Sequence, residues 1–267
     1  GKKAATFAGG VIDLNQDGQT ELILVNDGTP TEIIFNGFNG DTMPAQEGDA
    51  ARPVAGMSFT PIRLGPDERI GIHIANIYEG NTDQASFTPE ARGLFFDNDN
   101  QQVDQEIRQR IYKQTTFSEE PAPADLLLAH DAANDAIVDL ASGSLQEQPP
   151  EWSWGSAAGD LNGDGLDDIV ITHGQVHGSR YHCGIRLLIQ DKDQRFAPVT
   201  DLSGLDTDGL CARSVVLEDF DADGDLDLIA SNGYQAKIFE NTTDVPPGNA
   251  QPPWHGMVRG FLSQPRL

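Results

Sequence analysis

Three short stretches of the chain crowd acidic side chains together, and each is followed at once by an apolar run. They read "DLNQDGQTE" at 13–21, "DLNGDGLDD" at 160–168 and "DFDADGDLD" at 219–227. Aligned at their first aspartate, they share the pattern D-x-[DN]-x-D-G-x-x-[DE]. Oxygens at positions 1, 3 and 5 converge on one point when such a loop coils, and glycine at position 6 permits the sharp bend. Without a cation, carboxylates held this close would repel one another.

The oxygen-rich pattern favours Ca²⁺, because a backbone carbonyl at position 7 and the acid at position 9 would complete a shell of six to eight oxygens. We therefore predict about three Ca²⁺ ions per chain. An EF-hand requires glutamate at position 12 and flanking helices, but position 12 here is Leu24, Ile171 or Ala230. The alternative is three acidic turns that hold no metal. The predicted ligands are Asp13, Asn15, Asp17, Gln19 and Glu21; Asp160, Asn162, Asp164, Leu166 and Asp168; and Asp219, Asp221, Asp223, Asp225 and Asp227.

The elements around these loops predict an all-β fold. After each loop come a short apolar strand, a turn and a second strand, and β-branched runs bounded by Asn, Asp, Gly and Pro are typical of antiparallel hairpins. Asp160 and Asp219 lie 59 residues apart, a period that suggests propeller blades of about four strands. The stretch 61–80 is similar but lacks the acids, so it is predicted to be a degenerate blade.

The middle of the chain breaks this pattern. Apolar residues of 97–114 recur at helical spacing, which predicts a short amphipathic helix. The stretch 123–141 fits either a helix or two strands, and its alanines favour the helix. We therefore expect a helical insertion at about 97–141.

Two segments, "GSAAGDLNGDGLDDIVIT" and "RSVVLEDFDADGDLDLIASNG", resemble the FG-GAP/VCBS repeat family, whose best-known members are the N-terminal β-propellers of integrin α subunits. The resemblance extends over 4–40 and 150–245. It implies a propeller that carries Ca²⁺ in loops on one rim. We accordingly expect a single propeller domain over 1–267 with about five blades.

Charge narrows the choice of partner. The chain has 17 Lys and Arg against 42 Asp and Glu, a formal net charge of −25, which would repel nucleic acid and anionic membrane surfaces. No apolar run of about 18 residues occurs, so no membrane span is predicted. The function that fits best is a secreted, periplasmic or cell-surface binding or adhesion module, non-catalytic, that engages a glycan or a protein.

A catalytic alternative rests on one histidine-rich hairpin. His173, His177 and His182 lie close together in sequence and could bind a transition metal or serve a lyase-like or dehydratase-like enzyme, as some propellers of this type do. No G-x-S-x-G, Walker or HExxH motif occurs. The tryptophans Trp152, Trp154 and Trp254 could stack on sugar rings or plug the core.

The chain has two cysteines, Cys183 and Cys211. In an oxidising compartment they would form one disulfide closing a loop of about 28 residues. The alternative is a pair of buried free thiols. A disulfide is the form expected of a secreted calcium-binding protein.

Overall fold

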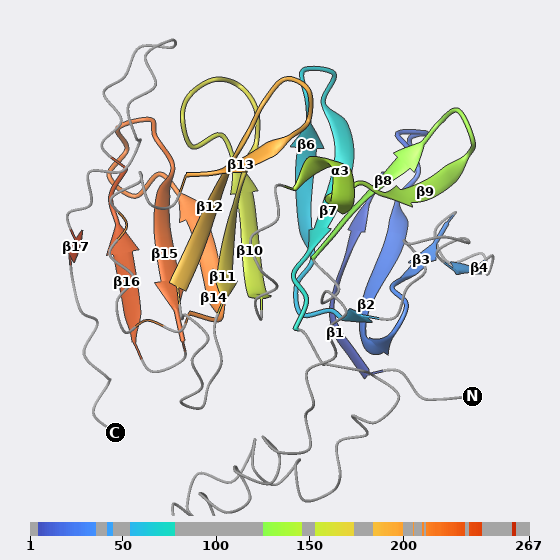
Figure 1. The fold of residues 1–267 in the computed structure, drawn as a ribbon, viewed down its shortest axis with the longest axis horizontal. Coiled ribbons are helices and arrows are strands. Elements are labelled where there is room, and N and C mark those ends of the chain that lie inside the picture. The colour runs from blue at the N-terminus through green and yellow to red at the C-terminus, as the bar shows by residue number, and fades with distance from the viewer. Residues whose placement is uncertain are drawn as a thin grey trace, which may run out of the picture.

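The computed structural model describes residues 5–35, 42–44, 54–77, 125–145, 153–173, 184–199, 205, 210, 212–232, 235–241 and 258–259. Within these ranges the fold is all-β, as predicted, with one short helix, α3 (Ala141–Ser144). The strands form four antiparallel sheets in chain order (Figure 1). In Figure 1, the first and the last of these sheets in chain order lie at opposite ends of the series.

Each sheet is built from consecutive strands. Sheet 1 contains β1 (Ala5–Ile12), β2 (Glu21–Thr29), β3 (Glu32–Ile34), β4 (Thr42–Pro44) and β5 (Val54–Ala55); sheet 2 contains β6 (Thr60–Leu64), β7 (Arg69–Ile74), β8 (Leu126–Asp131) and β9 (Ala136–Asp139). Sheet 3 contains β10 (Ser153–Gly159), β11 (Asp168–His173), β12 (Gly184–Gln190) and β13 (Phe196–Pro198); sheet 4 contains β14 (Ser214–Glu218), β15 (Asp227–Ser231), β16 (Ala236–Phe239) and β17 (Val258–Arg259).

Side chains of alternating strand positions fill the spaces between successive sheets. Leu126 and Leu128 of β8 pack in a cluster with sheet 1, whereas Leu127 and Ala129 pack in a cluster with sheet 3. A third cluster joins sheets 3 and 4. Because side chains of a strand point alternately to its two faces, sheets 2 and 3 are buried on both sides.

The helix favoured for 123–141 is wrong over Leu126–Asp139, where the second alternative, two strands, is observed. Burial on both faces explains the apolar run of β8, since a strand covered on both sides need not alternate with polar residues. Asp131 ends the strand by accepting hydrogen bonds from the Ala133 backbone N–H and the Asn134 side chain. The remaining part of the predicted insertion, 97–124, lies outside the described residues.

The first strands of the sheets lie very close to the neighbouring sheets. A Cβ on Gly155 of β10 would lie 2.7 Å from the carbonyl oxygen of Arg213, just before β14, and one on Gly10 of β1 would lie 2.3 Å from the Phe59 ring. The Thr60 hydroxyl of β6 donates to the carbonyl of Ser156 in β10 at 3.0 Å. This close approach explains the small residues of β1 and β10, which precede the first two acidic stretches.

The two end sheets each have an apolar row on the face that points away from the series. Val11, Leu22 and Ile34 are paired across sheet 1, and Val216, Ile229 and Ile238 across sheet 4. Val11 is 59% exposed and Val216 is 52% exposed. Like the rows that pack between sheets, these rows consist of apolar side chains paired across neighbouring strands, but no described sheet covers them.

The close approach of sheets 3 and 4 predicts a specific effect of one methyl group. We expect Gly155→Ala to lower the free energy of unfolding by about 1–3 kcal/mol, because its Cβ would meet a backbone oxygen that cannot move alone. Gly10→Ala should cost less, because the Phe59 ring can rotate away. Urea unfolding of both variants beside wild type tests this, and an equal or larger loss for Gly10→Ala would contradict it.

Candidate metal-binding loops

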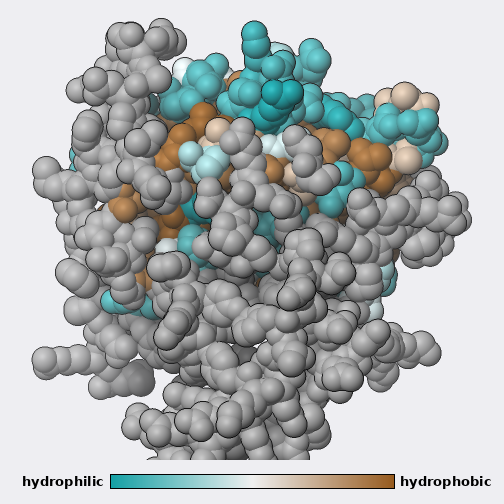
Figure 2. All heavy atoms as spheres, in the orientation of Figure 1, coloured by the Kyte–Doolittle hydropathy of each residue, from teal (hydrophilic) through white to brown (hydrophobic). Residues whose placement is uncertain are grey.

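The three acidic stretches are the connections between the first and second strands of sheets 1, 3 and 4. We call them the first loop (13–21), the second loop (160–168) and the third loop (219–227). They lie at the upper edge of the molecule in Figure 1, together with the β6–β7 turn. Figure 2 shows hydrophilic residues gathered along this edge above a band of hydrophobic ones.

Within each loop the aspartate at position 1 organises the backbone. Asp160 accepts hydrogen bonds from the backbone N–H groups of Asp164 and Gly165 at 3.1 and 2.8 Å. The same pair of bonds occurs in the first loop, at 3.0 and 2.8 Å, and in the third, at 3.1 and 3.2 Å. The three loops therefore have one conformation.

Two residues of each loop adopt a left-handed backbone. The glycine at position 6 does so in all three loops, with φ of 87° at Gly18, 89° at Gly165 and 102° at Gly224, as the pattern predicted. Position 4 does so as well, although it is Gln16, Gly163 or Ala222, with φ of 59°, 72° and 61°. Because position 4 is a different residue type in each loop, the sequence alone did not reveal this second left-handed position.

The side chains at positions 3 and 5 accept further hydrogen bonds from the backbone of the loop. The Asp164 backbone N–H also donates to Asn162 Oδ1, and Asp164 Oδ1 accepts the N–H of Leu166 at position 7. In the third loop, where position 3 is an acid, carboxylate oxygens of Asp219, Asp221 and Asp227 all lie within 4.8 Å of one another. That is the convergence expected of a site for a hard cation.

The acid at position 9 is buried beneath each loop. Glu21, Asp168 and Asp227 are at most 2% exposed, and each accepts the backbone N–H of position 2, at 2.7, 3.0 and 3.0 Å. Asp168 also accepts the N–H of Gln190, the last residue of β12, and Asp227 that of Asn241, two residues after β16. This acid therefore has a structural role in addition to the predicted one.

The electrostatics of position 9 are unfavourable for a bare carboxylate. Burial raises the pKa of Asp168 to about 8, with a further contribution from the charges of Asp164 and Asp160. Burial, together with Asp17 and Asp13, likewise raises the pKa of Glu21. Glu21 Oε1 is buried and has no hydrogen-bond partner among the described residues. A cation at these loops would offset both the cost of burying a charged carboxylate and the repulsion from the neighbouring acids.

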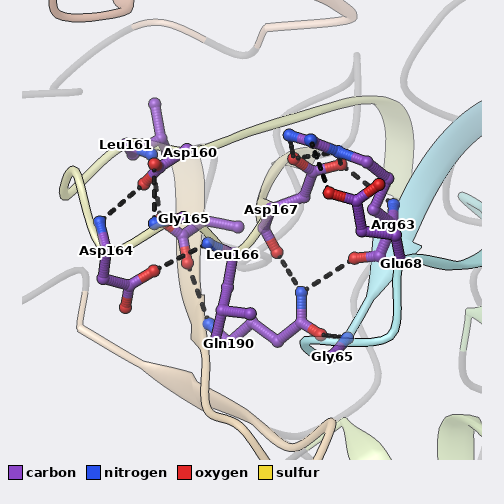
Figure 3. A network of polar contacts seen from close by, with 11 residues as sticks. Arg63, Gly65, Glu68, Asp160, Leu161, Asp164, Gly165, Leu166, Asp167 and Gln190 are labelled. Carbon is purple, nitrogen blue, oxygen red and sulfur yellow. Dashed lines mark hydrogen bonds and ion pairs between the residues drawn. The ribbon is translucent and has the colours of Figure 1, made fainter.

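The second loop is bound to sheet 2 by a polar network (Figure 3). Arg63 of β6 contacts the carboxylate of Asp167, at position 8, with Nη2 at 2.5 Å and Nε at 3.1 Å. The Gln190 side chain donates to the carbonyls of Arg63 and Asp167 and accepts the Gly65 N–H at 2.6 Å. Sequence inspection missed this network because no local pattern links residues so far apart in the chain.

A second polar cluster joins sheets 2 and 3. Ser156 Oγ lies 2.8 Å from His73 Nδ1 and 2.7 Å from Thr60 Oγ1, and His73 Nε2 lies 3.5 Å from Asp125 Oδ2. The imidazole of His73 is completely buried, so it is shielded from any substrate. The cluster is an internal tie between strands.

The structure describes one of the three histidines on which the catalytic alternative depends. His173 is buried at the end of β11, and His177 and His182 lie outside the described residues.

Among the predicted tryptophans, Trp154 of β10 has the Arg213 guanidinium 4.5 Å from its ring centroid, while Trp152 and Trp254 lie outside the described residues. Cys183 and Cys211 are also outside, so the disulfide stays a prediction.

Comparison with known proteins bears on the loop-containing part of the chain. Residues 160–230 match the family model described as FG-GAP-like repeat. The predicted resemblance is therefore confirmed over a segment that contains the second and third loops and the strands between them. No curated protein matches the chain. In the described part of the chain, no helix has both the length and the apolar character needed to cross a membrane.

The buried acid of the second loop predicts a pH dependence for the calcium-free protein. The pKa of Asp168 rises from 3.8 to about 8 on folding, so the unfolded chain loses this proton first. The contribution of Asp168 to the free energy of unfolding is fully present below about pH 4 and is lost as the pH rises to about 8. We expect the unfolding free energy of chelator-treated wild type to fall between pH 5 and pH 8.

Asp168→Asn should flatten this fall, because the amide does not ionise. The exposed acid Asp193, on the β12–β13 turn, supplies the matched control, since Asp193→Asn also replaces one carboxylate by an amide, but at an exposed position. Urea unfolding at the two pH values measures the effect. Parallel behaviour of Asp168→Asn and wild type would show that this ionisation is not responsible.

Proposed function

We propose that the chain is a calcium-binding module of β-propeller type that acts by binding and not by catalysis. The observation that carries the proposal is the common conformation of the three loops, with carboxylates converging in the third. The third loop brings three carboxylates together, as Ca²⁺ requires, and the backbone conformation shared by the other two loops extends the proposal to them. The FG-GAP-like repeat at 160–230 supports the same function.

Calcium in this proposal has a structural task. Each loop connects the first two strands of a sheet, and its buried acid bonds to the second residue of the loop. A divalent ion would neutralise the loop acids and so hold the upper edge of the molecule rigid. A rigid edge lowers the ordering cost of binding a partner.

The partner class follows from charge. A net charge of −25 disfavours nucleic acid and anionic membranes. We therefore propose a glycan or a protein as the ligand, and a secreted, periplasmic or cell-surface location, where free Ca²⁺ is available.

The sheets are proposed to be propeller blades, about five in number, of which four are described. Apolar rows on the outer faces of sheets 1 and 4 support this, because one further sheet between them would cover both. Position 2 of the loops gives the same indication: Leu14 and Leu161 are 2% exposed and pack against the next sheet, whereas Phe220 is 47% exposed.

We expect metal analysis of the native protein to find three Ca²⁺ per chain. Asp17→Ala, Asp164→Ala and Asp223→Ala, each at the exposed position 5, should each remove one ion. Saturating Ca²⁺ should stabilise the fold by about 3 kcal/mol per site at a hundredfold excess over Kd. Native mass spectrometry and thermal unfolding measure both, and an unchanged ion count in all three variants would refute the assignment.

The binding role is tested by a glycan array and a protein pull-down with Ca²⁺ and with chelator. We expect ligand capture that chelator abolishes and that the triple variant Asp17→Ala/Asp164→Ala/Asp223→Ala lacks. Asp193→Ala is the matched control and should retain capture. Capture that is equal with and without Ca²⁺ would contradict a calcium-dependent module.

The fifth blade is tested through Val216. If a further sheet covers this face in solution, Val216→Asp should destabilise the protein by more than about 2 kcal/mol, because it buries an unpaired charge. If the face stays open, the cost should be within about 0.5 kcal/mol. Urea unfolding decides between the two results, and the second would speak against closure.

A further inference from the structure

The second loop differs from the other two at position 8. That position is Thr20 in the first loop and Leu226 in the third, but Asp167 in the second. Asp167 is 7% exposed, so its carboxylate needs compensation for the water that it loses. Figure 3 shows it pointing toward Arg63 of sheet 2, with Asp160 and Asp164 at the other end of the loop.

Arg63 holds this carboxylate by its side chain and its backbone together. The guanidinium contacts Asp167 Oδ1 through Nη2 and Nε, and the Arg63 backbone N–H donates to Oδ2 at 2.9 Å. A fork of this kind fixes direction as well as charge. The charge of Asp160 also contributes to the raised pKa of Arg63, so the guanidinium is within electrostatic reach of position 1.

Gln190 extends the same connection to the acid at position 9. Its backbone N–H donates to Asp168 Oδ1 at 2.9 Å, while its side chain contacts Arg63 and Gly65 of sheet 2. The third loop has a related amide: Asn241 donates to the carbonyls of Leu161 and Leu226 at 3.0 and 3.3 Å. At the third loop, however, position 8 is apolar and offers no carboxylate to an arginine.

We propose that Arg63 is a positioning residue for cation binding at the second loop, and that through it the cation strengthens the contact between sheets 2 and 3. The inference rests on the proposed calcium function. By holding Asp167 away from the cluster, Arg63 fixes the end of the loop before the ion arrives, which lowers the ordering cost of binding. Because coupling is reciprocal, the bound ion must stabilise the Arg63 contact by the same factor.

The sign of the effect separates this role from simple electrostatics. Removal of a nearby positive charge should by itself strengthen the binding of a cation. Loss of a positioning contact should weaken it. We expect Arg63→Met to weaken Ca²⁺ binding at the second loop by about tenfold, within the range usual for such coupling.

The experiment uses the full chain with one loop left intact. In an Asp17→Ala/Asp223→Ala parent, calorimetric titration with Ca²⁺ reports the second loop, and Arg63→Met is then added. Arg63→Lys keeps the charge but loses the fork, so it should weaken binding as well. In the matched Asp17→Ala/Asp164→Ala parent, which retains the third loop, Arg63→Met should leave the affinity unchanged.

The coupling has its own measurement. Hydrogen exchange should show that Ca²⁺ slows amide exchange in β6 of the second-loop parent, and that this slowing is lost with Arg63→Met. Unchanged or tighter Ca²⁺ binding in a folded Arg63→Met protein would overturn the inference. If the parent itself binds no Ca²⁺, the proposed calcium function fails at this loop, and that result is distinct from an Arg63 effect of the wrong sign.

Discussion

A buried carboxylate at the ninth position of each acidic loop is the contact on which the local structure depends. Glu21, Asp168 and Asp227 each accept the backbone N–H of position 2, and so close the loop over the start of the second strand. A carboxylate without water is tolerated only where hydrogen bonds or opposite charge replace that water. The shape of the loop and the register of its strands are therefore determined together.

The packing of sheets in series explains why strands of one fold have different sequence patterns. β11, in sheet 3, is buried at every position, whereas β14, in the end sheet, alternates for part of its length. A sheet covered on both faces accepts apolar residues at successive positions. The sequence of a strand thus reflects its place in the series as much as its own propensity.

The acidic loops and the strands that follow them were predictable because glycine, aspartate and β-branched residues carry that information locally. For 123–141 a helix was favoured over the alternative of two strands because alanine favours helices, and the burial that overrides this preference over Leu126–Asp139 comes from sheets 1 and 3. Asp131, Asn134 and Asp135 were the local signal for the β8–β9 turn. The bond of Asp168 with Gln190 and the contact of Asp167 with Arg63 depend on strands brought together by folding, so no sequence pattern could show them. The bond between positions 2 and 9 lies within each loop, but its donor is a backbone N–H, so no residue type at position 2 indicates it.

Sheet 2 has no acidic loop, yet it contacts the loops on both sides of it. The Gln16 side chain of the first loop donates to the carbonyl of Glu68 at 3.4 Å, and Asp167 of the second loop is held by Arg63. Strand β6 places the guanidinium of Arg63 beside the second loop, although the β6–β7 turn itself contains Asp67 and Glu68. A fourth acidic loop here would add repulsion between neighbouring loops, because like charges at this spacing interact strongly in partly buried surroundings. Sheet 2, which has no acidic loop of its own, therefore supplies the positive charge that compensates the buried carboxylate of Asp167 in the second loop.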